Sequence, residues 1–380
     1  MSVLERAIAA VSPSWALRRS EARMRREMIQ ASGYDRHGAS VTKKSMAGWR
    51  TDAGGPDSDI VYNLDKLRER SRDLCMGEGL AIGALKTIRT NEIGAGLRLN
   101  SQIDAAYLKI SDEEAQAWED HVEREFMLWA GSKACDAARR CTFGELQALA
   151  RLSQLQSGDV FALLPAIPRF GDRFETKVRL VEADVVCNPD VIEIGQNILG
   201  GVEVGEYGEP LAYHFLNYHP GDVLQQYLRP APLRKWTRIP AFGERTGRPM
   251  VLHLMESDRP GQRRGVPVLA PVMEALKQLS RYKEAELMAA VVSGFFTAAI
   301  TSEMPDAKIG SIEVQSKDQV PSQPSDVQLA PGLLLGLQPG EKLDSINPAR
   351  PNAGFEPFVI AVSKQIGAGL GIPYELLVMQ

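Results

Sequence analysis

The side chains of this sequence that could bind a metal ion stand at none of the spacings that metal sites use. Its five histidines are scattered, without an HxxxH or HExxH arrangement, and its four cysteines include no CxxC pair. His214 and His219 come nearest to a ligand pair, but a loop after a strand offers a hydrogen-bonded histidine at least as readily. We therefore expect no metal and no cofactor. Four cysteines are also too few for a secreted disulfide framework in 380 residues, which favours a reducing compartment.

Sequence motifs of the common enzyme classes are missing as well. No GxxxxGK[ST] loop could cradle phosphates, no GxGxxG lies between a strand and a helix, and no GxSxG marks a serine nucleophile. Glu182 and Asp184 could act as acid and base, but nothing in one sequence singles out such a pair. We expect no catalytic residue and no enzyme, and a hydrolase built from scattered carboxylates remains an alternative.

Length and charge limit the remaining classes. At roughly 150 residues per domain, 380 residues correspond to two or three domains, and 44% hydrophobic residues can build real cores. Lys and Arg (44) against Asp and Glu (48) leave a net charge of −4, without the basic excess of a protein that binds nucleic acid tightly.

No secretion signal is visible. The longest uncharged apolar stretch, Leu287 to Ser302, has 16 residues, fewer than the roughly 20 that cross a bilayer, and indicates a buried helix.

The positive charge is concentrated at the N-terminus. Residues 1–50 hold ten basic and four acidic side chains, a balance of +6, and Gly38 to Asp59 is typical of a linker. Such a segment is either an arm that touches nucleic acid or another subunit, or a solvated helix face. A DNA-binding module acting through this arm is a second alternative function.

Helical periodicity is clearest in the first half of the chain. Residues 63–90 predict two helices with a break at Gly77 to Gly79. Ser111 and Glu114 form a capping box ahead of a helix over about 112–130, and Thr142 to Gln156 predicts another. Between about 160 and 255, short β-rich runs alternate with Gly, Pro and Asp.

One long helix is predicted from Val266 to about Ala299. The 28 residues from Pro271 to Ala298 would span roughly 40 Å. Its second half is apolar nearly all round and rich in small residues, which suits close packing on other helices.

Several stretches, taken in order, resemble the lambda-type phage portal proteins. The most characteristic begins at Glu256, where an Arg-Pro-Gly-Gln-x-Arg-Gly turn leads into a helix with the block Tyr282, Ala285, Glu286 and Leu287. The segments LRERSRDL, NEIGAGLRLNSQID, LQSGDVFALL and IGAGLGIPYELL resemble the same pattern, which covers the chain from about residue 60 to its end. The family's pattern continues beyond Pro-Tyr-Glu-Leu-Leu, whereas this sequence stops at Gln380, so we expect the C-terminal part of the pattern to be missing from it. Whether the sequence includes the crown and the whole channel wall is then an open question.

The resemblance implies a non-enzymatic ring, typically a dodecamer, at one vertex of a viral capsid, with double-stranded DNA passing through its centre. It implies a virion component assembled in the host cytoplasm, with a terminase motor, major capsid and scaffold proteins and head-tail connector proteins as partners, and no membrane. The fold class is then α+β, with a helical wing and stem and an inserted β-containing clip module. The expected parts are a basic arm (1–60), a helical wing-like region (61–159), a β-rich clip candidate (160–255), a stem-type helix (256–300) and a wing or channel-side region (301–380).

A channel that conducts DNA must avoid tight phosphate binding, so we expect a polar and acidic lumen with sparse cations and weak, sequence-independent contacts. The candidates are Lys277, Arg281 and Lys283, although Glu274, Glu284 and Glu286 could neutralise them within the helix. A closed ring of identical subunits also needs two different complementary faces. For one of them, the candidates are Ala289, Ala290 and Phe295.

Overall fold

A computed structural model describes residues 15, 18–19, 21–24, 43–46, 48–49, 51, 53–193, 196–222, 234–295, 299–302, 341–344 and 354–378. The chain divides into two compact units, Met1–Gly55 and Pro56–Gln380. In the first unit, the described residues among 15–24 are helical and a 3₁₀ turn spans Lys44–Met46. Most of the predicted basic arm lies outside the described residues. All that follows concerns the second unit.

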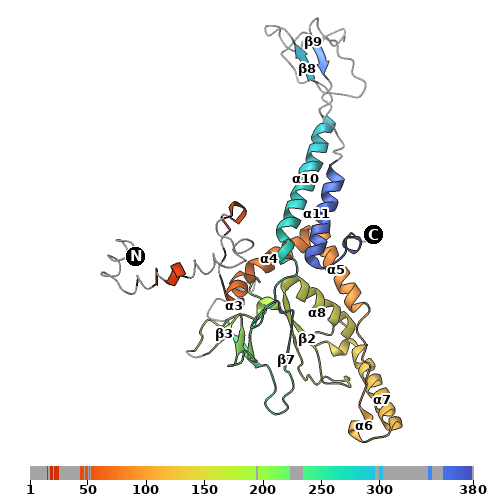
Figure 1. The fold of residues 1–380 in the computed structure, drawn as a ribbon. Coiled ribbons are helices and arrows are strands. Elements are labelled where there is room, and N and C mark those ends of the chain that lie inside the picture. The colour runs from red at the N-terminus through yellow and green to blue at the C-terminus, as the bar shows by residue number, and fades with distance from the viewer. Residues whose placement is uncertain are drawn as a thin grey trace, which may run out of the picture. The chain divides into compact units, whose positions relative to one another are not determined.

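A helical core holds the second unit together (Figure 1). After the short α3 (Pro56–Ile60), α4 (Leu64–Gly77) and α5 (Gly79–Ile93) follow each other, and α8 (Phe143–Ser157), α10 (Met273–Phe295), α11 (Phe355–Leu370) and α12 (Tyr374–Leu377) pack with them. The predicted break between two helices is confirmed, since Glu78 has an extended backbone between α4 and α5. The fully or nearly fully buried side chains at the centre are Ala81, Ala84, Leu85, Leu269, Leu276 and Ile366.

Two capping boxes start the helices of the next layer. Ser111 and Glu114 cap α7 (Asp112–Ala130), which follows the four-residue α6 (Ala105–Leu108), and Thr142 and Glu145 cap α8 in the same way. Both predicted helices are therefore confirmed. Phe126 and Trp129 of α7 pack against Phe143 with ring centroids 5.6 and 4.9 Å from it, which joins the two helices.

The strands between 159 and 255 form two antiparallel sheets. One has the order β2-β1-β7, from Arg179–Glu182, Asp159–Leu163 and Val251–Met255. The other has the order β3-β4-β5-β6, from Ile198–Leu199, Val202–Val204, Pro210–Leu216 and Trp236–Pro240. Phe161 of β1 packs against Tyr213 and Phe215 of β5, so the two sheets share one core.

The long helix is shorter than predicted at both ends. Residues 266–269 are not helical, and α10 begins at Met273 after a 3₁₀ turn, Ala270–Val272. The reason is local, because Pro267 and Pro271 lack an N–H and the N–H of Val268 donates to the carbonyl of Leu155 on α8 instead. The next described residues after Phe295 form strand β8 (Ala299–Ser302), which pairs with β9 (Glu341–Asp344).

The apolar stretch from Leu287 to Ser302 is therefore not a single buried helix. It is divided between the end of α10 and β8, and Leu287 is 65% exposed. Within the described part of the chain, no helix combines the length and the hydropathy that a bilayer crossing requires. The mixture of helix and sheet agrees with the predicted α+β class.

Candidate functional site

The predicted DNA contacts occupy two different faces of α10. Lys277 and Arg281 stand one turn apart on one exposed face. Lys277 has its Nζ 4.0 Å from Oδ2 of Asp73 on α4, and both side chains are more than half exposed, so this is a weak pair. Lys283 is different, because its Nζ lies 2.6 Å from Oε1 of Glu78, a side chain that is only 10% exposed. Lys283 is thus bound to the body of the unit.

The predicted interface residues lie near an exposed apolar strip at the far end of α10. Ala289 is half-buried and Ala290 is exposed, whereas the side chain of Phe295 lies outside the described residues. Leu287, Met288 and Val291 around them are 65%, 57% and 45% exposed. We call these three residues the α10 strip. Large apolar side chains gathered on one helix end are typical of a surface that another helix covers.

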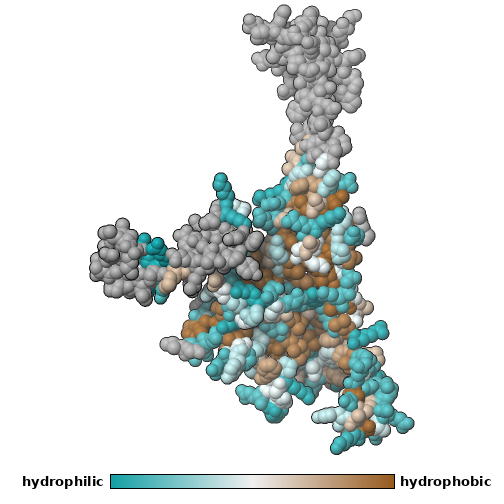
Figure 2. All heavy atoms as spheres, viewed as in Figure 1, coloured by the Kyte–Doolittle hydropathy of each residue, from teal (hydrophilic) through white to brown (hydrophobic). Residues whose placement is uncertain are grey.

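A second apolar surface lies on the other side of α10, where the helix meets α11. Tyr282 of α10 packs against Phe355 and Phe358 of α11, at centroid distances of 5.6 and 4.8 Å, and Phe358 remains 48% exposed. A groove between the two helices is lined by Ala275, Leu279, Tyr282, Phe358 and Val362. Figure 2 shows hydrophobic surface over these helices on the face drawn.

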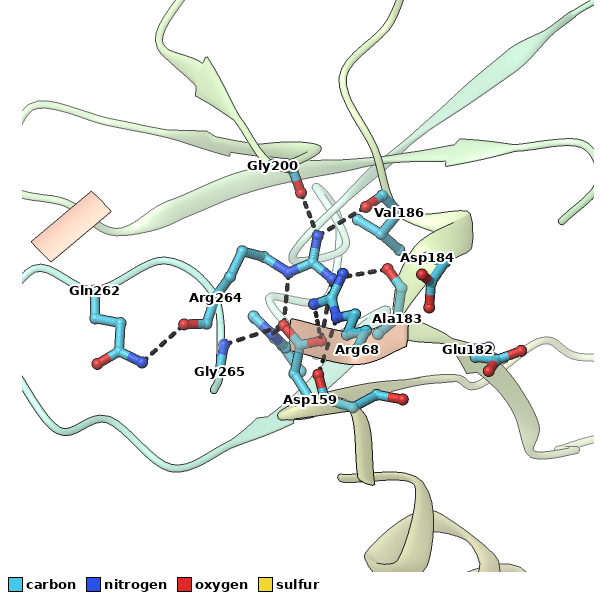
Figure 3. Close-up of polar contacts among 12 residues, drawn as sticks. Arg68, Asp159, Glu182, Ala183, Asp184, Val186, Gly200, Gln262, Arg264 and Gly265 are labelled. Carbon is cyan, nitrogen blue, oxygen red and sulfur yellow. Dashed lines mark hydrogen bonds and ion pairs between the residues drawn. The ribbon is translucent and has the colours of Figure 1, made fainter. Parts of the chain in front are cut away.

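The Arg-Pro-Gly-Gln-x-Arg-Gly turn has a structural task. Its Arg264 is 2% exposed and donates from Nε and Nη2 to the carboxylate of Asp159, at 2.6 and 3.0 Å (Figure 3). The remaining guanidinium donors reach the carbonyls of Ala183, Val186 and Gly200. One side chain thereby fixes the start of β1, the 3₁₀ turn Ala183–Val185 and the turn between β3 and β4.

Asp159 gathers further partners from separate elements. Arg68 of α4 donates from Nη2 at 2.9 Å, and His253 of β7 has its Nε2 at 3.1 Å. Burial alone would raise the pKa of Asp159, but Arg264, His253 and Arg68 hold it well below its usual range. Burial lowers the pKa of His253 and outweighs the neighbouring carboxylate. We call Arg68, Asp159, His253 and Arg264 the buried arginine network.

Glu182 and Asp184, the carboxylates singled out in the sequence, do lie together. With His219 they place ligand atoms within 4.8 Å of one another. Arg72 of α4 already binds both carboxylates, with Nη2 3.0 Å from Glu182 Oε1 and a hydrogen bond to Asp184. A cation would therefore compete with this guanidinium. His214 is not part of the cluster; it is buried with its Nε2 3.2 Å from Glu203 Oε2.

Comparison with known proteins gives matches over most of the chain. The model of the family described as phage portal protein, lambda family, matches residues 42–380. The chain is 26% identical to portal protein B of Escherichia phage lambda over 357 residues, which are 90% of this chain and 65% of that protein. It is 25% identical to the portal protein of Escherichia phage N15, covering 87% of this chain and 64% of that protein. The chain thus spans a little less than two thirds of the length of these relatives.

Solved structures give weaker likenesses. A chain from the virion of a native gene transfer agent particle is 14% identical with a TM-score of 0.46, covering 88% of this chain and 73% of that one. A chain from the neck of an empty particle of this kind, computed with C6 symmetry, is 14% identical with a TM-score of 0.47, covering 89% and 74%.

Proposed function

The chain belongs to the lambda family of phage portal proteins, and from this premise we propose that it forms a closed ring at one capsid vertex through which double-stranded DNA is packaged and ejected. The observation that carries the proposal is the family match over residues 42–380. Neither alternative, a carboxylate-based hydrolase or a DNA-binding module acting through the N-terminal arm, gains support from the comparisons.

The proposal includes a set of partners and a place. The ring, a dodecamer in the typical case, is set among the major capsid and scaffold proteins while it assembles in the host cytoplasm, and it becomes part of the virion. It docks the terminase motor during packaging and head-tail connector proteins afterwards. The chain contributes binding surfaces to these steps and no catalytic residue.

The charge of the chain supports passage of DNA rather than its retention. Each phosphate that a protein neutralises adds affinity by releasing counterions, and tight binding would stall a moving duplex. The net charge is −4, and the two exposed cations on one face of α10, Lys277 and Arg281, are sparse contacts of the kind that a lumen tolerates. Lys283 supports the helix through Glu78 instead.

The exposed apolar surface of α10 supports assembly into a ring. A head-to-tail ring needs two different and complementary binding surfaces on every subunit. The α10 strip, with Ala289 and Ala290, is our candidate for one of them, because its large side chains are about half-exposed and burying the rest of each would contribute about 1 kcal/mol, roughly half the value of full burial.

We assign α10 as the stem helix and keep two candidates for the clip. The first is the β-rich region 160–255, whose strands share a core and whose β1 packs on α8. The second is the antiparallel pair of β8 and β9; three residues separate β8 from the end of α10, and residues 303–340 separate the two strands in the chain. Rings that lose the terminase motor when β8 and β9 are replaced by a short linker would assign the clip to the second candidate.

The mass of the purified protein in solution, measured together with its affinity for duplex DNA, tests the proposal. We expect a particle of many subunits that binds duplex weakly at moderate salt and without sequence preference. A stable single subunit, or nanomolar non-specific binding by the assembled particle, would contradict it.

A further inference from the structure

A phenylalanine stands fully exposed at the tip of the hairpin that joins β1 to β2. Phe170 is 106% exposed, more than any other large apolar side chain among the described residues. A fully buried phenylalanine is worth about 1.5–3 kcal/mol relative to an exposed one, so the free subunit forgoes that stabilisation at this position. Exposed aromatic side chains that become buried on association are the usual anchors of protein interfaces.

The hairpin fixes the backbone from which the Phe170 side chain projects. Ala166 bridges Thr176, the N–H of Ile167 donates to Glu175, and Gly171 closes the turn with a φ of 82°, which an L side chain rarely adopts. The strands of the hairpin are thus paired up to the turn that presents Phe170.

The buried side chain of Lys177 stabilises the turn that carries Phe170. The side chain of Lys177 is 0% exposed, and its Nζ donates to Asp172 Oδ2 at 2.9 Å and to the carbonyl of Phe174 at 2.6 Å. Arg139 also pairs with Asp172 at 3.2 Å. Burying an ammonium group is costly unless it is fully paired. An arrangement of this kind preorganises the tip, and preorganisation lowers the entropy that binding must overcome.

The same chain has a pocket that is large enough to hold the side chain of a phenylalanine. A cavity of about 210 Å³ lies where the end of α8 meets the segment before α10; one side of its wall is apolar and the other is polar, with Leu155, Val266, Pro267 and Val268 on the first and Arg151, Gln154, Glu256 and Asp258 on the second. Cavities of roughly 150 Å³ with apolar walls accept a benzene ring.

The charges beside the pocket and beside Phe170 are of opposite sign. Glu256, which is 72% exposed, and Glu92 share Arg151 of the pocket wall, and the exposed Asp258 adds a third carboxylate. Arg173, which is 64% exposed, pairs with Glu125 of α7, and the half-buried Arg169 donates from Nη2 to the carbonyl of Ala137; both cations flank Phe170 at the hairpin tip. Around the pocket three carboxylates face one guanidinium, which leaves an excess of negative charge, whereas Arg169 and Arg173 place positive charge beside the aromatic ring of the tip.

We infer that Phe170 of one subunit inserts into this pocket of the next copy of the chain. The tip and the pocket are different surfaces, so the contact is head-to-tail and repeats around a closed ring. This inference rests on the proposed ring and adds to it a second interface, separate from the α10 strip.

Substitutions at two exposed aromatic tips test the inference. Tyr207 is 90% exposed in the turn between β4 and β5 and serves as the matched control. With the full chain, Phe170→Asp should raise the protein concentration needed for ring formation about tenfold or more, whereas Tyr207→Asp should leave it unchanged. The melting temperature of the subunits should stay the same in both variants, because neither aromatic side chain contacts the core of the subunit. Assembly of Phe170→Asp at the wild-type concentration would overturn the inference.

Cross-linking locates the contact. In the double variant Arg173→Cys and Asp258→Cys, which keeps Phe170, a short bismaleimide should join neighbouring subunits into a ladder of covalent oligomers, which neither single variant gives. Wild-type rings whose double variant stays monomeric on a denaturing gel would place Phe170 elsewhere and overturn the inference while leaving the ring intact. Absence of rings from the wild-type protein would instead contradict the proposed function.

Discussion

Lys283 Nζ lies 2.6 Å from Glu78 Oε1, and this ion pair joins the middle of α10 to the turn between α4 and α5. Glu78 is 10% exposed and Lys283 is 39% exposed, so the pair is partly shielded from water. A cation held in this way positions the helix rather than meeting DNA.

Replacing Lys283 should therefore affect stability and not DNA binding. Lys283→Met leaves the Glu78 carboxylate without its partner, and we expect a loss of about 1–3 kcal/mol in the free energy of unfolding by denaturant. Arg281→Met, on the exposed face of the same helix, should change it by less than about 0.5 kcal/mol. Unchanged stability together with weaker binding of duplex by Lys283→Met would show that this side chain faces DNA.

Removing Arg264 should be among the most damaging single changes. Arg264→Met takes two charge-assisted hydrogen bonds from the buried carboxylate of Asp159 and three from the carbonyls of Ala183, Val186 and Gly200, so we expect a loss of about 3–5 kcal/mol in the free energy of unfolding. Arg259 lies in the same turn as Arg264 and forms an exposed ion pair with Asp59 of α3. Arg259→Met breaks this pair, and the free energy of unfolding should fall by less than about 1 kcal/mol. Equal unfolding midpoints for the two variants in urea would refute the structural task given to Arg264.

The buried arginine network also predicts that stability falls in acid. The pKa of His253 is lower in the folded chain than in the unfolded chain, so below about pH 6.5 the unfolded chain takes up a proton that the folded one resists. Stability is then lost at up to about 1.4 kcal/mol per pH unit as the pH falls toward the folded pKa. The pKa of Asp159 is lowered too, so the same sign holds below about pH 4.

Denaturant unfolding of the full chain between pH 7.5 and 5 would measure this effect. His253→Gln has no proton to gain, and its stability should fall less over that range than that of the wild type. If both proteins lost the same stability, His253 would not be the group that titrates.

A bulky charge in the exposed half of α10 should block assembly without unfolding the subunit. Ala290→Arg places a guanidinium beside the α10 strip, and we expect the concentration for ring formation to rise about tenfold or more at an unchanged melting temperature. Ala117→Arg, at an exposed position on α7, is the matched control. Rings of Ala290→Arg at the wild-type concentration would argue that this face takes no part in the interface.

Local sequence signals predicted the helices but not the contacts that fix them. The start of α7 follows from the capping box of Ser111 and Glu114, whose partners lie three residues apart, and the structure shows a box of the same kind at the start of α8. The partners of Asp159, by contrast, lie 91 and 105 residues away at Arg68 and Arg264, and no periodicity relates positions so distant.

The same limit explains the predicted channel residues. Carboxylates within α10 were the expected partners of its cations, but Lys283 pairs with Glu78, 205 residues away. The predicted start of the long helix was wrong because apolar composition continues through 266–272, whereas the backbone there bonds to α8. The resemblance to portal proteins was carried by linked motifs, and the structure gives one of them, the turn before α10, a physical reason.

Electron microscopy of the purified full chain is the most direct test of the central claim. We predict particles with rotational symmetry and an open centre wide enough for a DNA duplex. A field of single subunits at micromolar concentration, or closed particles without a central opening, would contradict the account.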